Sequence, residues 1–282
     1  MPELPEVENI AQSLRDEIIG LKIKDVCVRR PNIIRGAYMR QWRKAADKLI
    51  NRAITAVTRR GKRLIIFTDS DLAILVQFGM TGKFLLGTNS VPLDKHTHFY
   101  INFMFDRQLR LVDPRRFGRV WFMEHPGQSN LDQTMLNAGM SKLGLEPFGV
   151  TARQFRQLLD SKRVIKTILL DQTRIAGLGN IYVDESLFRA GLHPGGIAAD
   201  IEPAQAEKLR RAVVSVLKSA IIHGGTTFSD FRNAYGEMGR FRRRLKVYQR
   251  QGSPCPRCKT PIERMVIAGR GSHFCPECQP KK

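Results

Sequence analysis

Residues 99–112 read Phe99-Tyr100-Ile101-Asn102-Phe103-Met104-Phe105-Asp106-Arg107-Gln108-Leu109-Arg110-Leu111-Val112. From Phe99 to Phe105 every second residue is aromatic or aliphatic, which is the period of a strand with one buried face. Asp106-Arg107 separates this run from a second one and indicates a hairpin turn. The stretch therefore predicts two antiparallel strands.

Similar short runs, rich in β-branched and aromatic residues, surround this hairpin. The expected strands are Lys22–Arg29, Ile54–Arg59, Arg63–Thr68, Leu72–Phe78, Lys83–Leu86, Phe99–Phe105, Gln108–Val112 and Arg119–Met123. Regular spacing without intervening helices favours an antiparallel sandwich or barrel. Residues 5–19 carry one apolar stripe at helical spacing and predict a leading helix packed on the strands.

The pattern becomes helical after about residue 130. Thr151 and Gln154 form the signature of a capping box. A second apolar stripe runs from Ala206 to Ala220 and ends before Gly224-Gly225. The sequence thus predicts an α+β chain with a domain boundary in a linker near residues 135–150.

Composition limits the classes of partner. Of the 282 residues 42% are hydrophobic, and 47 Lys and Arg outnumber 26 Asp and Glu for a net charge of +21. Nucleic acid is the favoured partner, because each neutralised phosphate releases bound counterions. An anionic membrane surface is the alternative, but the basic residues follow no single amphipathic helix. Without an apolar run of roughly 18 residues or a secretory signal, a cytoplasmic protein is expected.

Two Cys-x2-Cys pairs lie near the C-terminus. Cys255, Cys258, Cys275 and Cys278 have the spacing of a four-thiolate zinc site, and residues 259–274 are long enough to form a hairpin between the pairs. Two disulfides are the alternative, which an intracellular chain disfavours. Four cysteines leave no open coordination position, so we expect one structural zinc ion and look elsewhere for chemistry.

The N-terminus reads Met1-Pro2-Glu3-Leu4-Pro5-Glu6-Val7-Glu8. If Met1 is removed, Pro2 exposes a secondary amine. An α-amino group of pKa about 8 is about 10% neutral at pH 7, roughly two hundred times more than a lysine. Such an amine can form a Schiff base with a carbonyl carbon, and Glu3 is placed to move protons. The alternative is an acidic first turn that only complements the helix dipole.

Four motifs in order resemble formamidopyrimidine-DNA glycosylases. They are the N-terminal octapeptide, Asp113-Pro114-Arg115-Arg116-Phe117-Gly118, Gly177-Leu178-Gly179-Asn180-Ile181-Tyr182 and the four-cysteine segment ending at Gln279. The resemblance spans Pro2 to Gln279. It implies a bifunctional enzyme that excises oxidised purines such as 8-oxoguanine and formamidopyrimidines from duplex DNA and then cleaves the strand by β,δ-elimination.

The family fold that this implies agrees with the periodicity. It comprises a β-sandwich catalytic domain over 1–135, a helix-two-turn-helix DNA-binding domain over 136–235, and a lesion-recognition loop with the zinc finger over 236–282. The resemblance also implies duplex DNA with oxidised bases as partner, a DNA-associated location and no nucleotide cofactor. We expect a monomer.

Five residues match catalytic positions of the family. Pro2 resembles the nucleophile that attacks the deoxyribose C1′, and Glu3 the acid that assists base loss. Glu6 matches a supporting carboxylate. Lys62 resembles the lysine of DNA contact and β-elimination, and Arg270 the finger arginine of δ-elimination.

Seven further residues match DNA-contacting positions. Met80, Arg115 and Phe117 resemble the three residues that fill the space left by an extruded base. By spacing alone, Met80 and Phe117 would be core residues. The remaining matches are His96, Lys162, Lys166 and Asn180, the last at a glycine-rich helix start that suits an anion.

Three departures concern base preference. Gln77 stands where the family commonly has a histidine, and Ser229 where Lys or Arg is frequent. Asn233, Ala234 and Tyr235 replace the usual acidic residue before Gly236 in the segment that covers the extruded base.

Three rival functions remain. An endonuclease VIII-type enzyme for oxidised pyrimidines typically has Gly where Leu4 stands and lacks the 113–118 motif. A non-catalytic DNA-binding relative would not need Pro2, Glu3 and Lys62 together. A ribosome-associated basic finger protein would not explain the N-terminus.

Overall fold

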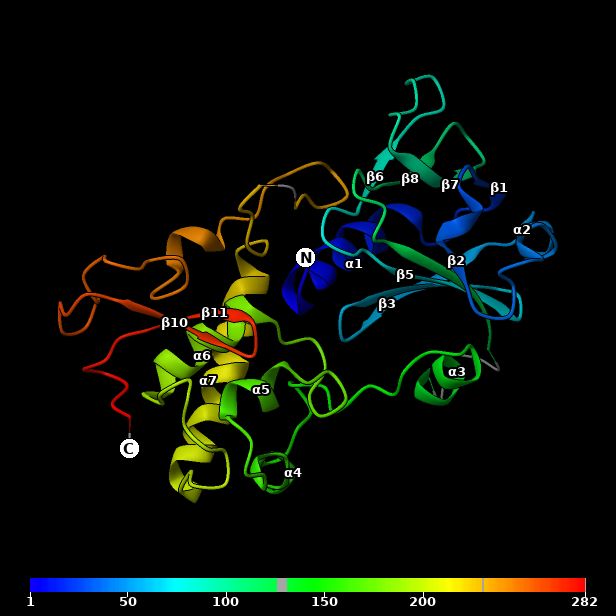
Figure 1. The fold of residues 1–282 in the computed structure, drawn as a ribbon. Coiled ribbons are helices and arrows are strands. Elements are labelled where there is room, and N and C mark those ends of the chain that lie inside the picture. The colour runs from blue at the N-terminus through cyan, green and yellow to red at the C-terminus, as the bar shows by residue number, and fades with distance from the viewer. Residues whose placement is uncertain (126–130, 230, 282) are drawn as a thin grey trace. The chain divides into compact units, whose positions relative to one another are not determined.

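The computed structural model describes residues 1–125, 131–229 and 231–281. The chain divides into two compact units, one of Met1–Lys142 with His223–Arg240 and the other of Leu143–Ile222 with Phe241–Lys282 (Figure 1). This division differs from the three expected ranges, because 223–240 groups with the first unit. Among the described residues, no helix has the length and hydropathy needed to cross a membrane.

The first unit contains two sheets. The four-stranded sheet has the order β1-β7-β8-β6, and the five-stranded sheet has the order β2-β9-β5-β4-β3. The strands are β1 (Ile23–Val28), β2 (Ile34–Arg35), β3 (Ile54–Arg60), β4 (Arg63–Thr68), β5 (Leu72–Gln77), β6 (Lys83–Gly87), β7 (Thr97–Phe103), β8 (Gln108–Val112) and β9 (Arg119–Glu124). All eight expected strands are present, and every pair is antiparallel except β2 with β9.

The central hairpin differs from its prediction at one end. The side chains of Phe99, Ile101 and Phe103 are fully buried, but β7 ends at Phe103 and Phe105 is 94% exposed. Phe105 and Asp106 both have positive φ, as a tight turn with the twist of a hairpin requires. The turn therefore begins earlier than expected, and Phe105 lies outside the strand.

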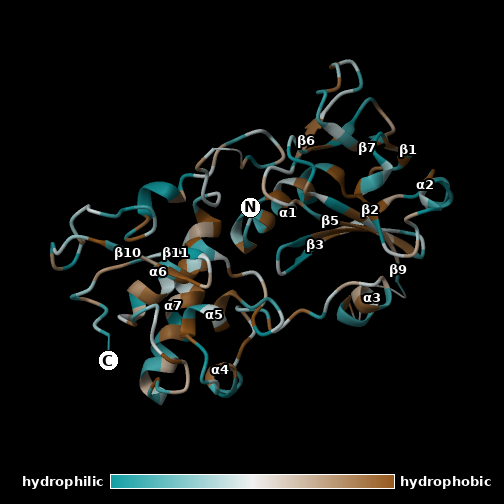
Figure 2. Ribbon diagram, in the orientation of Figure 1, coloured by the Kyte–Doolittle hydropathy of each residue, from teal (hydrophilic) through white to brown (hydrophobic). Residues whose placement is uncertain are grey.

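Helices complete this unit. The leading helix α1 (Leu4–Ile18) appears as predicted, whereas α2 (Trp42–Leu49) and α3 (Leu131–Asn137) were not expected. One cluster of buried side chains includes Leu14 of α1, Ile66 of β4 and Ile101 of β7, so both sheets and the leading helix share a core. β5 is the central strand of the five-stranded sheet, and Figure 2 shows hydrophobic residues along it. The sandwich is confirmed.

The second unit is helical and ends in a short hairpin. It comprises α4 (Ala152–Leu159), α5 (Ile165–Leu170), α6 (Asn180–Ala190), α7 (Pro203–Ile222), the 3-10 helix η2 (Phe241–Arg244), β10 (Glu263–Ile267) and β11 (Arg270–Phe274). The expected capping box is present, with Gln154 N donating to Thr151 Oγ1 at 3.2 Å. Gly191 ends α6 in the left-handed conformation that favours glycine.

Candidate active site and DNA-binding surface

The N-terminal motif forms a buried start to α1. Pro2 and Glu3 are buried, whereas Met1 is 57% exposed. Glu3 is the N-cap, and its backbone nitrogen donates to Glu6 Oε2 at 2.8 Å within a capping box. Glu3 and Glu6 therefore have a structural role, since Glu6 fixes the backbone of the residue after Pro2.

Glu6 also holds a distant segment. The backbone nitrogen of Thr226 donates to Glu6 Oε1 at 2.7 Å, and both groups are buried. A Cβ on Gly225 would lie 2.9 Å from the same oxygen, and its φ of +79° is one that favours glycine. Glu6 thus joins the start of α1 to the segment 223–240.

The sequence departures in that segment also contact α1. The backbone nitrogen of Ala234 donates to Ser13 Oγ at 3.3 Å, and the Tyr235 hydroxyl donates to Glu17 at 3.3 Å. Asn233 Oδ1 accepts from the backbone nitrogens of Tyr235 and Glu237 at 3.0 and 2.9 Å. These contacts order the segment and attach it to α1, which begins at Leu4. For Gln77 and Ser229 the structure gives no comparable explanation.

Lys62 lies at the turn between β3 and β4, half-buried. Arg59, near one end of the turn, pairs with Glu8 of α1 at 2.9 Å, and Arg60 pairs with Asp132 of α3 at 2.8 Å. Two helices therefore fix the turn that carries Lys62. Sequence reasoning missed these partners because they are far away along the chain.

Met80, Arg115 and Phe117 come together. The Arg115 guanidinium lies 4.9 Å from the centre of the Phe117 ring and 3.9 Å from Met80 Sδ. Met80 is 38% and Phe117 48% exposed, so neither belongs to the core as spacing alone suggested. An exposed cluster of a thioether, a cation and an aromatic ring suits insertion into a base stack.

Asp113 organises the two loops that carry this cluster, a role that the sequence analysis missed. Its Oδ1 accepts from Thr81 Oγ1 at 2.5 Å, and its Oδ2 accepts from the Gly118 nitrogen at 2.7 Å. The backbone nitrogen of Arg115 in turn donates to Thr81 Oγ1 at 3.2 Å. Asp113 is 1% exposed, so its carboxylate binds both loops from the protein interior.

The histidine pair lies beside the same loop. His96 is half-buried, and its carbonyl accepts from the Asp113 nitrogen at 3.0 Å. His98 is 2% exposed with Nε2 2.9 Å from the Asp113 carbonyl, and burial lowers the pKa of His98 below its usual value. His98 is therefore a neutral structural residue, and DNA contact by His96 stays a prediction.

In the second unit, Asn180 begins α6 directly after the glycine-rich turn, as expected. Its side-chain Nδ2 donates to the Gly271 carbonyl at 2.8 Å, so this nitrogen is used within the protein. A phosphate at this helix start would thus meet backbone N–H groups of the first turn. Lys162 is exposed before α5, as a DNA contact requires.

Lys166 is a correction. Its side chain is 0% exposed and pairs with Asp184 at 2.5 Å, so it has no surface to offer a phosphate. The expected DNA contact of Lys166 is wrong for this structure. Its ammonium also donates to the Gly271 carbonyl at 3.1 Å, next to the exposed Arg270 at the start of β11.

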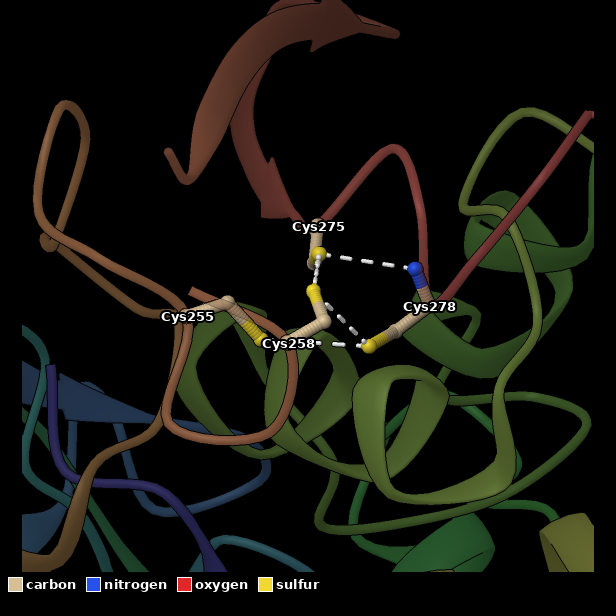
Figure 3. Close-up of side chains that lie close together, drawn as sticks. All are labelled: Cys255, Cys258, Cys275 and Cys278. Carbon is tan, nitrogen blue, oxygen red and sulfur yellow. Dashed lines mark hydrogen bonds between the residues drawn. The ribbon is translucent and has the colours of Figure 1, made fainter. Parts of the chain in front are cut away.

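The four cysteines converge as predicted (Figure 3). All ligand sulfurs lie within 4.8 Å of one another, with Sγ–Sγ distances of 3.4 Å for Cys258–Cys275, 3.5 Å for Cys258–Cys278 and 3.8 Å for Cys255–Cys278. A Zn–S bond of about 2.3 Å places tetrahedral sulfurs about 3.8 Å apart, so the cluster fits one zinc ion. These residues would hold the metal as a structural brace.

Comparisons with known proteins agree with this geometry. Sequence models of the formamidopyrimidine-DNA glycosylase N-terminal domain, its H2TH domain and the zinc finger found in FPG and IleRS match residues 1–120, 143–232 and 252–281. The formamidopyrimidine-DNA glycosylase of Latilactobacillus sakei is 40% identical over 100% of this chain and 99% of its own. The chain belongs to the formamidopyrimidine-DNA glycosylase family. Its counterpart from Geobacillus kaustophilus is also 40% identical, over 99% of this chain and all of its own.

Solved structures of formamidopyrimidine-DNA glycosylases share the fold. A Lactococcus lactis FPG variant in complex with Fapy-dG containing DNA has a TM-score of 0.89 at 33% identity, covering 99% of this chain and 100% of its own. MutM in complex with carbocyclic 8-oxo-G containing DNA has a TM-score of 0.87 at 34% identity, with the same coverage. The chain is accordingly an enzyme of DNA repair, a DNA glycosylase with a zinc-finger domain.

Proposed function

We propose that this glycosylase excises oxidised purines, 8-oxoguanine and formamidopyrimidines, from duplex DNA and cleaves the abasic strand by β,δ-elimination. The observation that supports this proposal is the N-terminal arrangement, in which Glu6 fixes Glu3 beside a buried Pro2. Removal of the exposed Met1 would turn Pro2 into a secondary amine at that place. The solved relatives bound to Fapy-dG and 8-oxo-G DNA support the lesion class.

The proposed reaction uses this chain's residues in sequence. The Pro2 nitrogen attacks the deoxyribose C1′, the bond from C1′ to the base breaks with proton donation assisted by Glu3, and the ring opens to an iminium. Lys62 supports loss of a C2′ proton and cleavage of the C3′–O bond. Arg270 stabilises the phosphate that leaves C5′ in the second elimination.

Flipping a base out of the duplex costs a few kcal/mol, and side chains that contact the vacated stack offset this cost. We assign this task to the exposed cluster of Met80, Arg115 and Phe117. His96, Lys162 and the first turn of α6 at Asn180 supply phosphate contacts in this proposal. We further propose that the enzyme acts as a monomer inside the cell, which sedimentation with and without duplex tests.

The decisive experiment is borohydride trapping on a duplex with one 8-oxoguanine opposite cytosine. Borohydride reduces an iminium to a stable amine, so a covalent band reports the intermediate. The wild type should trap and cut the lesion strand, and Pro2→Gly should do so poorly.

Two outcomes would redirect the proposal. If the enzyme traps only on a duplex with an oxidised pyrimidine, the endonuclease VIII-type function replaces it. One Lactococcus lactis FPG structure, with a TM-score of 0.87, is a complex with an oxidised pyrimidine containing DNA, so this arm is needed. If correctly processed protein binds both duplexes without trapping or cutting, it is a DNA-binding relative.

A further inference from the structure

A buried ion pair in the second unit has no part in the functions assigned so far. Asp184 of α6 and Lys166 of α5 have side chains that are 0% exposed, and Asp184 Oδ1 lies 2.5 Å from Lys166 Nζ. Removing two charges from water costs about as much as their attraction returns, so such a pair is weak evidence of added stability. Its better-attested use is to fix one arrangement of the elements that it joins.

The elements joined here include the strand that begins with Arg270. Asp184 Oδ2 accepts from the backbone nitrogen of His273 at 2.8 Å and lies 3.2 Å from His273 Nδ1. Lys166 Nζ donates to the Gly271 carbonyl at 3.1 Å. Backbone groups one and three residues after Arg270 are thus bound to the same buried pair.

The helix start of α6 shares this frame. Asn180 Nδ2 donates to the same Gly271 carbonyl at 2.8 Å. Asn180 and Asp184 are four residues apart and lie on one face of α6. The first turn of α6, where a phosphate would bind, and the strand of Arg270 are therefore held to each other through three side chains.

Pairing across the hairpin also holds this strand. Arg270 pairs with Ile267 and Gly271 with Val266 in the β10–β11 register. Arg270 itself is exposed. The backbone beside Arg270 is fixed while its guanidinium remains available.

We propose that Asp184 is a positioning residue for δ-elimination, which through Lys166 and His273 aims Arg270 at the leaving phosphate. The inference rests on the proposed function of Arg270. In that step a proton passes from C4′ to solvent and its bonding pair forms the C4′=C5′ double bond. The C5′–O bond breaks, and the phosphate departs with the electron pair of that bond. If the guanidinium is displaced by about 1 Å, the rate of the step can fall about a hundredfold. Asp184 can therefore affect the rate although it does not contact the substrate.

The test uses Asp184→Asn in the full-length enzyme on a duplex with a preformed abasic site. The amide would present an NH₂ group to Lys166 or to the His273 nitrogen, so one contact is lost. The product with a 3′-phosphate should form about tenfold or more slowly. Borohydride trapping and the first cleavage should stay within about twofold, and one zinc per chain should remain. Glu207→Gln, which alters an acid paired with Arg210 on α7, is the matched control.

Arg270→Ala distinguishes the role of Arg270 in δ-elimination from the positioning role of Asp184. If Arg270→Ala leaves the ratio of δ to β product unchanged, the assigned role of Arg270 fails. If Arg270→Ala lowers that ratio and Asp184→Asn, still carrying zinc, does not, the positioning role is overturned. Combining both variants should lower the ratio no further than Arg270→Ala alone.

Asp184→Asn leaves Lys166 buried with less compensation and can prevent folding. The double variant Asp184→Leu with Lys166→Met removes both charges at similar volume and keeps the fold testable. It should bind zinc and show the low δ to β ratio, because the contact of Lys166 with Gly271 and the contacts of Asp184 with His273 are gone. A zinc-bound double variant with the wild-type ratio would refute the inference.

Discussion

The backbone nitrogen of Thr226 donates to Glu6 Oε1 at 2.7 Å, although the two residues are 220 positions apart. The other oxygen of the same carboxylate accepts from the Glu3 nitrogen at 2.8 Å. One buried side chain therefore orders both the residue after the proposed nucleophile and the segment that follows α7. In the proposed reaction, this carboxylate would couple the amine chemistry of Pro2 to the segment that covers the extruded base.

Glu6→Gln should weaken that coupling. An amide has one acceptor oxygen where two N–H groups need one each, so one buried donor loses its partner at a cost of about 1–3 kcal/mol. We expect slower borohydride trapping and faster hydrogen exchange at the Thr226 amide. Asp16→Asn, on an exposed position of the same helix, is the control. Unchanged exchange at Thr226 would contradict the assignment.

Asp113→Asn should disorder the cluster of Met80, Arg115 and Phe117. The variant keeps an acceptor for Thr81 or Gly118 but not for both. Excision of 8-oxoguanine from duplex should fall about tenfold or more, since the proposed base extrusion uses that cluster. Cleavage of a preformed abasic site should fall less. Equal loss of both activities would mean that Asp113 acts on the chemistry and not on extrusion; Asp25→Asn on β1 controls for loss of an acid.

Cys258→Ser should release zinc. A serine hydroxyl is not ionised at neutral pH, so the site keeps only three thiolates and its affinity falls by orders of magnitude. Metal analysis should give well under one zinc per chain, and DNA binding should weaken because the β10–β11 hairpin loses its brace. Cys27→Ser changes the cysteine outside the finger and should keep the metal. Full zinc content in Cys258→Ser would argue against the four-thiolate site.

The lowered pKa of buried His98 predicts how the free energy of unfolding depends on pH. Burial is the largest cause that lowers its folded-state pKa, and Arg30 lowers it further. Below a pH of about 6.5, the ordinary pKa of histidine, His98 binds a proton in the unfolded chain but not in the folded chain. The contribution of neutral His98 to the free energy of unfolding is therefore present above that pH and is lost as the pH falls. The free energy of unfolding by urea should drop from pH 7 to pH 5.

His98→Gln should reduce this pH dependence while keeping a donor for the Asp113 carbonyl. His193, whose pKa burial also lowers, leaves part of the slope in place. His96→Gln should change the slope less than His98→Gln, because it leaves the burial of His98 and its hydrogen bond intact. A slope identical in all three proteins would assign the effect to other groups.

Local periodicity predicted most of the fold. Each expected strand carries its own alternation or apolar run, so neighbouring residues suffice to find it. The two residues of β2 are too few for any pattern. In α2, Trp42, Ala45, Ala46 and Leu49 have helical spacing that identifies the helix once the signal is sought.

For the candidate site, the sequence predicted the residues within motifs but not their tertiary partners. The Cys-x2-Cys spacing identified the four cysteines, and the catalytic roles of Pro2 and Glu3 stay predictions from the family motif. Neither pattern gives the residues that hold these side chains in place. Lys166 was expected to contact DNA because it matches a basic position of the family, and its buried partner Asp184 lies 18 residues away on another helix. Contacts of this kind follow from tertiary packing, which no local period encodes.

Residues 223–240 group with the first unit although their sequence neighbours on both sides belong to the second. The stretch of gene that encodes the sandwich is therefore incomplete without codons placed far downstream. A recombination crossover between codons 143 and 222 would pair one parent's Glu6 with another parent's Thr226 loop. Such hybrids keep the contact wherever the first parent supplies a glutamate at position 6, because residue 226 contributes only its backbone nitrogen.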